Sequence, residues 1–182
     1  DVPFGKKVKD SIYKLTDEYS LCYLKFMEPN RTAGKGAWLK LSDTPLWKTW
    51  SGLAFETLCQ KHVPALKNAL GISGMYSHTS AWKSKAVTGK DNVQIDLVID
   101  RRDNCINICE MKFYNHPFSI DKNYAVLLRK KTQVFKEQTK TGKHLFVTFI
   151  TVFGLQHNQN SIGLIDHAIT VSSLFTYFAK EV

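Results

Sequence analysis

Two segments rich in Val and Ile, residues 93–100 and 105–113, are separated by only four polar residues, 101–104. β-Branched residues favour strands, and a short polar connection between two strands favours an antiparallel hairpin. Residues 145–153 are nearly continuously apolar, which is typical of a strand that is buried on both faces. These three segments predict a β-sheet at the centre of the molecule.

The length of the hairpin loop decides which residues of its two strands face each other. A three-residue loop over residues 102–104 would pair Asp96 with Glu110, and Asn104 suits the left-handed conformation that such loops need. A two-residue loop would instead set Asp96 opposite Met111 and direct the two acids to opposite faces of the sheet. Both alternatives are compatible with the sequence.

Helical patterns alternate with these strands. Apolar residues recur at intervals of three and four from Pro45 onward, and this helix is expected to renew at Pro64 and to stop at Gly71. We further expect a strand over residues 75–82, a basic amphipathic helix over residues 122–140 and a last helix over residues 171–180. On the basic helix, the candidate inward residues are Leu127, Val134 and Phe135. This order predicts an α/β fold with a mixed central sheet flanked by helices.

Residues 1–45 are expected to form an N-terminal helical extension that packs on a core domain of residues 46–182. Thr16 is a plausible N-cap for a helix that should end near Pro29. The chain starts at an Asp rather than a Met, which suggests a fragment or a processed product.

The composition limits the classes of partner. The 25 Lys and Arg residues against 16 Asp and Glu give a formal net charge of +9, which favours nucleic acid or another acidic partner. No apolar run approaches the roughly 18 residues that a membrane span needs, and four scattered Cys residues do not suggest a disulfide framework. We therefore expect a cytoplasmic protein without a membrane segment.

The hairpin also carries the residues with the clearest chemistry. Glu110 and Lys112 are two apart in a strand and so project from the same face. If Asp96 lies opposite Glu110, two like charges approach within about 5 Å between Cβ atoms, and a divalent cation would relieve the repulsion. Oxygen ligands from two carboxylates suit Mg²⁺ or Mn²⁺. Glu56, the one acid of the helix that begins at Pro45, lies near the edge of its apolar face.

An Asp followed on the next strand by Glu-x-Lys resembles the signature of the PD-(D/E)XK nuclease superfamily, here Asp96, Glu110 and Lys112. Glu56 matches the additional acid that many members carry on the helix before the sheet. Gln133, on the basic helix, corresponds to a further polar residue of some members.

The chain departs from the PD-(D/E)XK motif at one position, where Ile95 stands in place of the Pro before Asp96. A second resemblance extends over most of the chain. The chain is similar to the C-terminal nuclease-like domain of a bacterial and archaeal AAA-type ATPase family. The segments that carry this similarity are residues 13–19, 50–56, 69–72, 94–96 and 110–112.

These resemblances imply a restriction-endonuclease-like fold and metal-assisted hydrolysis of a DNA phosphodiester. Asp96, Glu110 and the main-chain carbonyl of Met111 would hold Mg²⁺ or Mn²⁺, and Glu56 would bind the ion directly or through water. Lys112 would orient the attacking water and stabilise the charge that grows on the phosphate.

The resemblances also imply partners. The charges of the basic helix have two interpretations: they contact DNA, with Lys130, Lys131 and Gln133 as the candidate residues, or they form only the solvated face of a helix that packs by its other side. An ATPase module of the same chain would precede the nuclease-like domain. The alternative is a catalytically inactive module of the same fold that binds DNA or that docks on the ATPase and regulates it.

Overall fold

A five-stranded mixed sheet forms the centre of the computed structural model, which describes residues 3–6, 9, 15–85 and 92–178. The strand order is β1-β2-β3-β5-β7, with antiparallel pairing from β1 to β3 and parallel pairing from β3 to β7. The strands are β1 (Ser77–Lys83), β2 (Gln94–Arg101), β3 (Cys105–Lys112), β5 (His144–Thr151) and β7 (His167–Thr170). The α/β class with a mixed central sheet is therefore confirmed, whereas β7 was not expected.

The hairpin of β2 and β3 has the three-residue loop. Leu97 pairs with Cys109 and Asp100 with Ile106, so that residues 102–104 form the loop. Asn104 has a φ of 63°, the left-handed conformation expected of it. The two-residue alternative is excluded.

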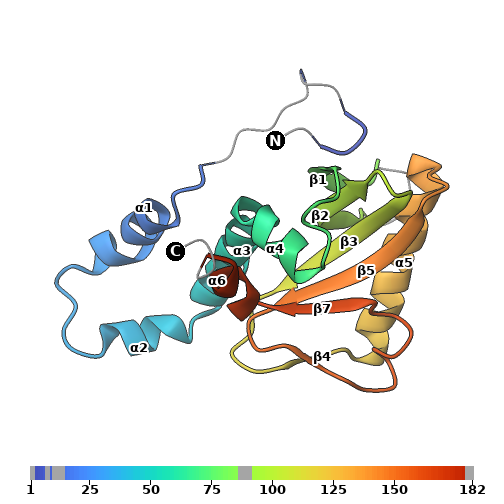
Figure 1. The fold of residues 1–182 in the computed structure, drawn as a ribbon. Helices are drawn as coiled ribbons and strands as arrows, with labels where there is room; N and C mark the ends of the chain where they lie inside the picture. Colours follow the sequence, from blue (N-terminus) through green and yellow to red (C-terminus); the bar gives the residue numbers. More distant parts are fainter. Residues whose placement is uncertain (1–2, 7–8, 10–14, 86–91, 179–182) are drawn as a thin grey trace.

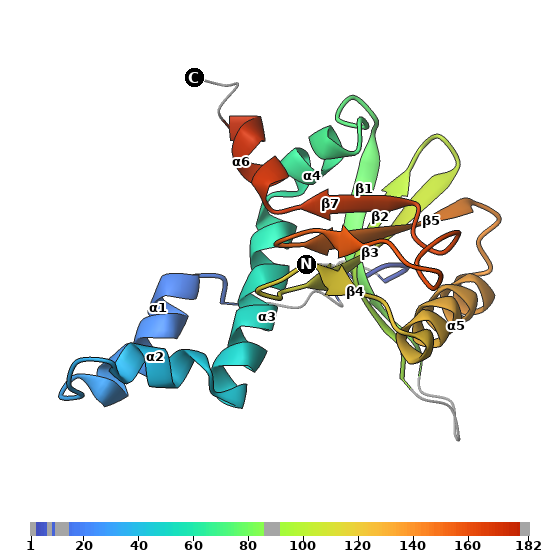
Figure 2. The same cartoon turned by 90° about the horizontal axis from the view of Figure 1, so that it is seen from below.

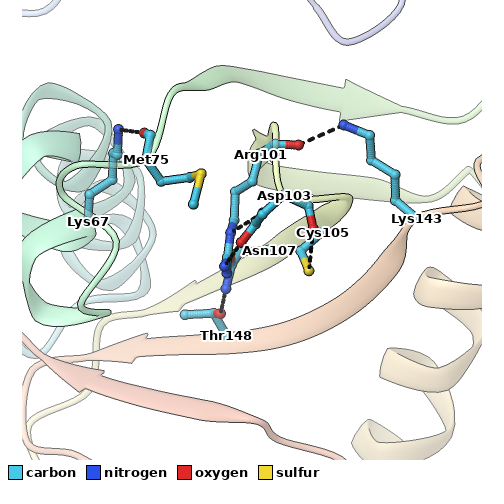
Figure 3. Close-up of polar contacts among 8 residues, drawn as sticks. All are labelled: Lys67, Met75, Arg101, Asp103, Cys105, Asn107, Lys143 and Thr148. Atoms are coloured by element: carbon cyan, nitrogen blue, oxygen red, sulfur yellow. Dashed lines mark hydrogen bonds and ion pairs between the residues drawn. The ribbon is translucent and has the colours of Figure 1, made fainter.

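Buried polar contacts hold the loop end of this hairpin to the neighbouring strand (Figure 3). The Arg101 Nη1 atom donates to Asn107 Oδ1 at 3.3 Å, and Asn107 Nδ2 donates to Thr148 Oγ1 on β5 at 3.1 Å. Asn107 and Thr148 are fully buried, so each supplies the partner that the other needs. From the other side, Lys143 donates to the Arg101 carbonyl at 2.8 Å. These contacts connect β2, β3 and β5 at the loop end of the hairpin, which is the end away from Asp96 and Glu110.

Helices cover both faces of the sheet (Figure 1). On one face lie α3 (Pro45–Lys61), α4 (Val63–Ala69) and α6 (Ser172–Phe178), and on the other lies α5 (Lys122–Thr139). Leu97 and Ile99 pack with the first group, whereas Val98 packs with Phe135 of α5. Phe149 and Ile150 of β5 are both fully buried and belong to clusters on opposite faces, which confirms that β5 is buried on both sides.

The helix ends follow local sequence signals. Thr44 caps α3 by accepting from the Trp47 amide, and Pro45 occupies the first turn. Pro64 lies in the first turn of α4, and Gly71, with a φ of 70°, follows its end. The last helix was expected over residues 171–180; α6 begins at Ser172, and residues 179–180 lie outside the described part.

The rotation of α5 differs from the expected one. Phe135 is fully buried as predicted, and Val134 is partly buried against the same cluster. Leu127 is 41% exposed, so its assignment to the inward face was wrong. Ala125 and Leu128 point to the sheet instead.

The N-terminal segment forms a helical arm that lies beyond α3, on the side away from α5 (Figure 2). Its α1 (Glu18–Cys22) is capped by Asp17 rather than by Thr16, because the Asp17 carboxylate accepts from the amides of residues 19 and 20. The other elements of the arm are a π-helical turn (Tyr23–Met27), a 3-10 turn (Glu28–Asn30) and α2 (Ala37–Ser42). Phe26 is buried against Trp47 and Trp50 of α3, which attaches the arm to the core.

Two short strands, β4 (Phe118–Ser119) and β6 (Leu155–Gln156), pair in parallel beside the main sheet. All four cysteines are free thiols. Among the helices of the described residues, none is both long enough and apolar enough to cross a membrane.

Candidate active site

The candidate site lies where β2 and β3 separate. Leu97 and Cys109 are the last pair of the ladder between β2 and β3. Beyond them β2 is irregular, because Ser80 of β1 pairs with Val98 whereas Trp82 pairs with Ile95, and Asp96 lies in this bulge. Beside it, the Met111 amide of β3 donates to Asp96 Oδ2 at 3.4 Å. The two acids that the sequence singled out are therefore neighbours across the strands.

Glu110 is buried, with 2% of its surface exposed, and both of its carboxylate oxygens have partners. Oε2 lies 2.7 Å from the Lys131 ammonium of α5. Oε1 lies 3.0 Å from the Lys112 ammonium and accepts from the Tyr124 hydroxyl at 2.7 Å. Burial alone would raise the pKa of Glu110, but the charges of Lys112 and Lys131 outweigh it and lower that pKa. Glu110 is thus the ionised member of the pair.

Asp96 behaves in the opposite way. Burial, followed by the negative charges of Glu110 and Glu56, raises the pKa of Asp96 to about 7. Two carboxyl groups whose surroundings separate their pKa values in this way are typical of acid–base and metal sites. Near neutral pH, Asp96 can accept or release a proton while Glu110 stays charged.

Lys112 and Tyr124 complete the surroundings of Glu110. Burial opposes the charge of Lys112, but Glu110 outweighs this effect, and the pKa of Lys112 is raised. Burial and the charge of Glu110 raise the pKa of Tyr124, so that its hydroxyl remains a hydrogen-bond donor. Lys112 also lies 5.7 Å from the centre of the Tyr124 ring. The site therefore holds one permanent carboxylate between two ammonium groups.

Glu56 reaches the site from α3, on the side opposite to α5. It lines, together with Asp96, a cavity of about 540 Å³ between α3, β1 and β2. Gln60, one turn further along α3, donates to the Asp96 carbonyl at 3.0 Å and so ties the helix to β2 at this residue. Hydroxyl and amide side chains contribute to the polar part of the cavity wall, namely Thr57, Thr79, Ser80 and Gln94. Asp96 is therefore accessible from this cavity.

The three residues expected to contact DNA have separate positions on α5. Lys131 is turned inward to Glu110, with 15% of its side chain exposed. Gln133 is exposed and donates to Glu137 at 2.8 Å, and Lys130 is partly buried. Tyr124 was not identified from the sequence, although its spacing of seven from Lys131 places both on one face of the helix.

The donor atoms at the site are those that a hard divalent cation prefers. The N–H and C=O of one residue in a regular strand are directed to the same side, so the Met111 carbonyl is expected on the side of its amide, which donates to Asp96. Asp96, Glu110 and this carbonyl provide oxygen ligands suited to Mg²⁺ or Mn²⁺. Within the described residues, no group of three or more His, Cys, Asp or Glu side chains is assembled as a metal site. The oxygen donors are thus of the type that Mg²⁺ or Mn²⁺ prefers, and Lys112 and Lys131 balance the negative charge of Glu110 in this structure.

Neither the comparison with protein-family models nor the comparison with curated proteins finds a match to this chain.

Proposed function

We propose that this chain is a metal-dependent nuclease domain of the PD-(D/E)XK type that hydrolyses DNA phosphodiesters. The observation that supports the proposal is the cluster at the end of the hairpin, where the Met111 amide donates to Asp96 Oδ2 at 3.4 Å and the Lys112 ammonium lies 3.0 Å from Glu110 Oε1. The mixed sheet with helices on both faces is compatible with such a fold. In this proposal the domain is cytoplasmic and works with an AAA-type ATPase module of the same chain.

The residues would divide the work as follows. Asp96, Glu110 and the Met111 carbonyl would hold Mg²⁺ or Mn²⁺, with Glu56 reached directly or through water. The bound ion would act as a Lewis acid on the phosphate and lower the pKa of a water molecule. Lys112, whose ammonium lies 3.0 Å from Glu110 Oε1, would orient that water and stabilise charge on the phosphate.

A second candidate is a domain of the same fold that binds DNA or regulates the ATPase without catalysis. One observation favours it: both oxygens of Glu110 are already engaged by Lys112, Lys131 and Tyr124. A carboxylate held in this way can serve a structural role without a metal ion.

Cleavage of circular single-stranded and duplex DNA in Mn²⁺ distinguishes the two candidates. We expect the wild-type protein to convert the circles to linear products, and Asp96→Asn and Lys112→Gln to lose this activity while they still bind DNA. Lys67→Gln is a matched control for the loss of one positive charge. Lys67 lies on α4 and donates to the Met75 carbonyl, outside the candidate site. Equal cleavage by the wild type and Asp96→Asn would exclude this site as its source. No cleavage by any form, together with no Mn²⁺ binding, would favour the inactive module.

A further inference from the structure

Lys131 is the feature of the site that the proposed mechanism does not use. Its side chain extends from α5 to the sheet, and its ammonium lies 2.7 Å from Glu110 Oε2. The side chain is 15% exposed and that of Glu110 is 3% exposed, so water screens the pair poorly. The other oxygen, Oε1, is shared by Lys112 and Tyr124. Both oxygens of the Glu110 carboxylate therefore already have a cationic partner.

We propose that Lys131 is an internal cation that competes with the divalent metal ion for Glu110. A phosphate group of the nucleic-acid backbone would relieve this competition by drawing the ammonium away from the carboxylate. The inference rests on the proposed function and adds regulation of the site by its substrate. The metal site is complete only when substrate is present. Lys131 is then a positioning residue, because it acts through Glu110.

The argument is electrostatic. A divalent ion at Glu110 and an ammonium group 2.7 Å from the same carboxylate would repel each other strongly in a site with little water. A metal ion that binds at Oε2 would take the position of the Lys131 ammonium, and the charged pair has to be broken for this to happen. A lysine ammonium is a point charge on a flexible stem, which suits it to move to a nearby phosphate.

The coupling works in both directions. If phosphate binding at Lys131 raises the affinity for the metal ion, the metal ion raises the affinity for phosphate by the same factor. The site would thus bind metal weakly on its own and tightly on DNA. Such an arrangement keeps a hydrolytic site inactive until a phosphodiester is in place.

Titration calorimetry with Mn²⁺ tests the competition directly. We expect Lys131→Gln, whose amide can still donate a hydrogen bond to Glu110, to bind Mn²⁺ about tenfold or more tightly than the wild type. Lys131→Arg, which keeps the charge, should resemble the wild type. Lys136→Gln is the matched control, because it removes the same charge from an exposed position of α5. Circular dichroism verifies the fold of each variant.

The Asp96→Ala/Glu110→Ala double variant separates the two levels of the proposal. Mn²⁺ binding that is lost in the double variant but equal in the wild type and Lys131→Gln would overturn the competition and leave the metal site in place. Mn²⁺ binding in none of the forms would overturn both the metal site and this inference.

Anisotropy of a labelled DNA duplex, with and without Mn²⁺, tests the role of phosphate. For each protein, the DNA affinity with Mn²⁺ is divided by the affinity without it, and this ratio is divided by the same ratio of the Asp96→Ala/Glu110→Ala double variant. The second division removes the effect of Mn²⁺ on the DNA alone. A gel verifies that the duplex is intact. We expect Mn²⁺ to strengthen DNA binding by the wild type several-fold more than by Lys131→Gln. An equal ratio in both proteins would overturn the phosphate step.

Discussion

At the level of single residues, Asp96 and Glu110 show how two buried acids on adjacent strands can differ in charge. Glu110 has two ammonium groups and a phenol as partners, whereas Asp96 has one amide hydrogen bond at 3.4 Å. The charges of Lys112 and Lys131 outweigh burial at Glu110, whereas burial and the charges of Glu110 and Glu56 outweigh the same two lysines at Asp96 and raise its pKa. The stability of the fold must therefore depend on the protonation of Asp96.

The first prediction concerns this dependence. The pKa of Asp96 is about 7 in the folded chain, above the ordinary value of 3.8, so the folded state holds a proton that the unfolded state has lost between these pH values. The free energy of unfolding should fall as the pH rises through this range. Asp96→Asn keeps an acceptor for the Met111 amide and carries no charge. We expect it to exceed the wild type by up to about 3 kcal/mol at pH 8 and to show no advantage near pH 4.

Urea denaturation in EDTA across this pH range measures the effect. Asp43→Asn, which changes an exposed acid, is the matched control. Parallel curves for Asp96→Asn and the wild type would show that Asp96 titrates alike in both states.

The second prediction concerns the hydroxyl of Tyr124. Tyr124→Phe keeps the ring contacts with Phe118 and Phe149 but removes the donor to Glu110 Oε1. The loss of a buried hydrogen bond to a charged acceptor should lower the free energy of unfolding by about 1–2 kcal/mol. Tyr114→Phe, at a ring that is 43% exposed, is the control and should have a much smaller effect. Equal effects in urea denaturation would show that the Tyr124 hydroxyl does not stabilise Glu110.

At the level of elements, the hairpin is the unit that carries the site to its position. Its loop is specified locally, because Asn104 adopts a left-handed conformation that most side chains avoid. We expect Asn104→Ala to lower the free energy of unfolding by about 1 kcal/mol and Asn104→Gly to change it by only a few tenths. Urea denaturation of both variants measures the difference. Similar costs of about 1 kcal/mol for Ala and Gly would show that the side-chain amide of Asn104, which both variants lack, stabilises the loop more than its left-handed conformation does.

The elements also show how far sequence patterns reach. The hairpin and α3 were predicted because turn residues, a proline and apolar spacing are local signals. The rotation of α5 about its axis was not predicted correctly. Leu127 and Val134 are seven residues apart, as are Leu128 and Phe135, so the helical repeat alone does not decide which pair faces the sheet. The short β7 has only four residues, and its pairing depends on the completed sheet.

The candidate site divides in the same way. Asp96, Glu110 and Lys112 follow from the alternation of a hairpin, which the sequence contains. The ion pair between Lys131 and Glu110 joins residues 21 positions apart. It depends on the placement of α5 against the sheet, which tertiary packing decides. Contacts of this kind become visible only in the folded structure.

At the level of the whole molecule, the net charge of +9 is spread over more than one surface, because the arm and α5 both carry Lys and Arg residues. The arm and α5 lie at opposite sides of the sheet (Figure 2). If α5 faces DNA, as the proposed function implies, charges on this helix should contribute more to DNA binding than equal charges on the arm. Salt dependence measures this contribution, because each neutralised phosphate releases condensed counterions.

The last prediction compares two double variants that lower the net charge equally. Arg129→Gln/Lys130→Gln changes α5, and Lys35→Gln/Lys40→Gln changes the arm. For a DNA duplex, we expect the α5 variant to reduce the slope of log affinity against log salt by about 1 to 2, and the arm variant to leave it nearly unchanged. Fluorescence anisotropy over a NaCl series in EDTA gives both slopes. A reduction that is the same in both variants would mean that DNA is attracted by the net charge alone. A reduction confined to the arm variant would place the DNA-binding surface on the arm around α2 and separate it from the candidate active site.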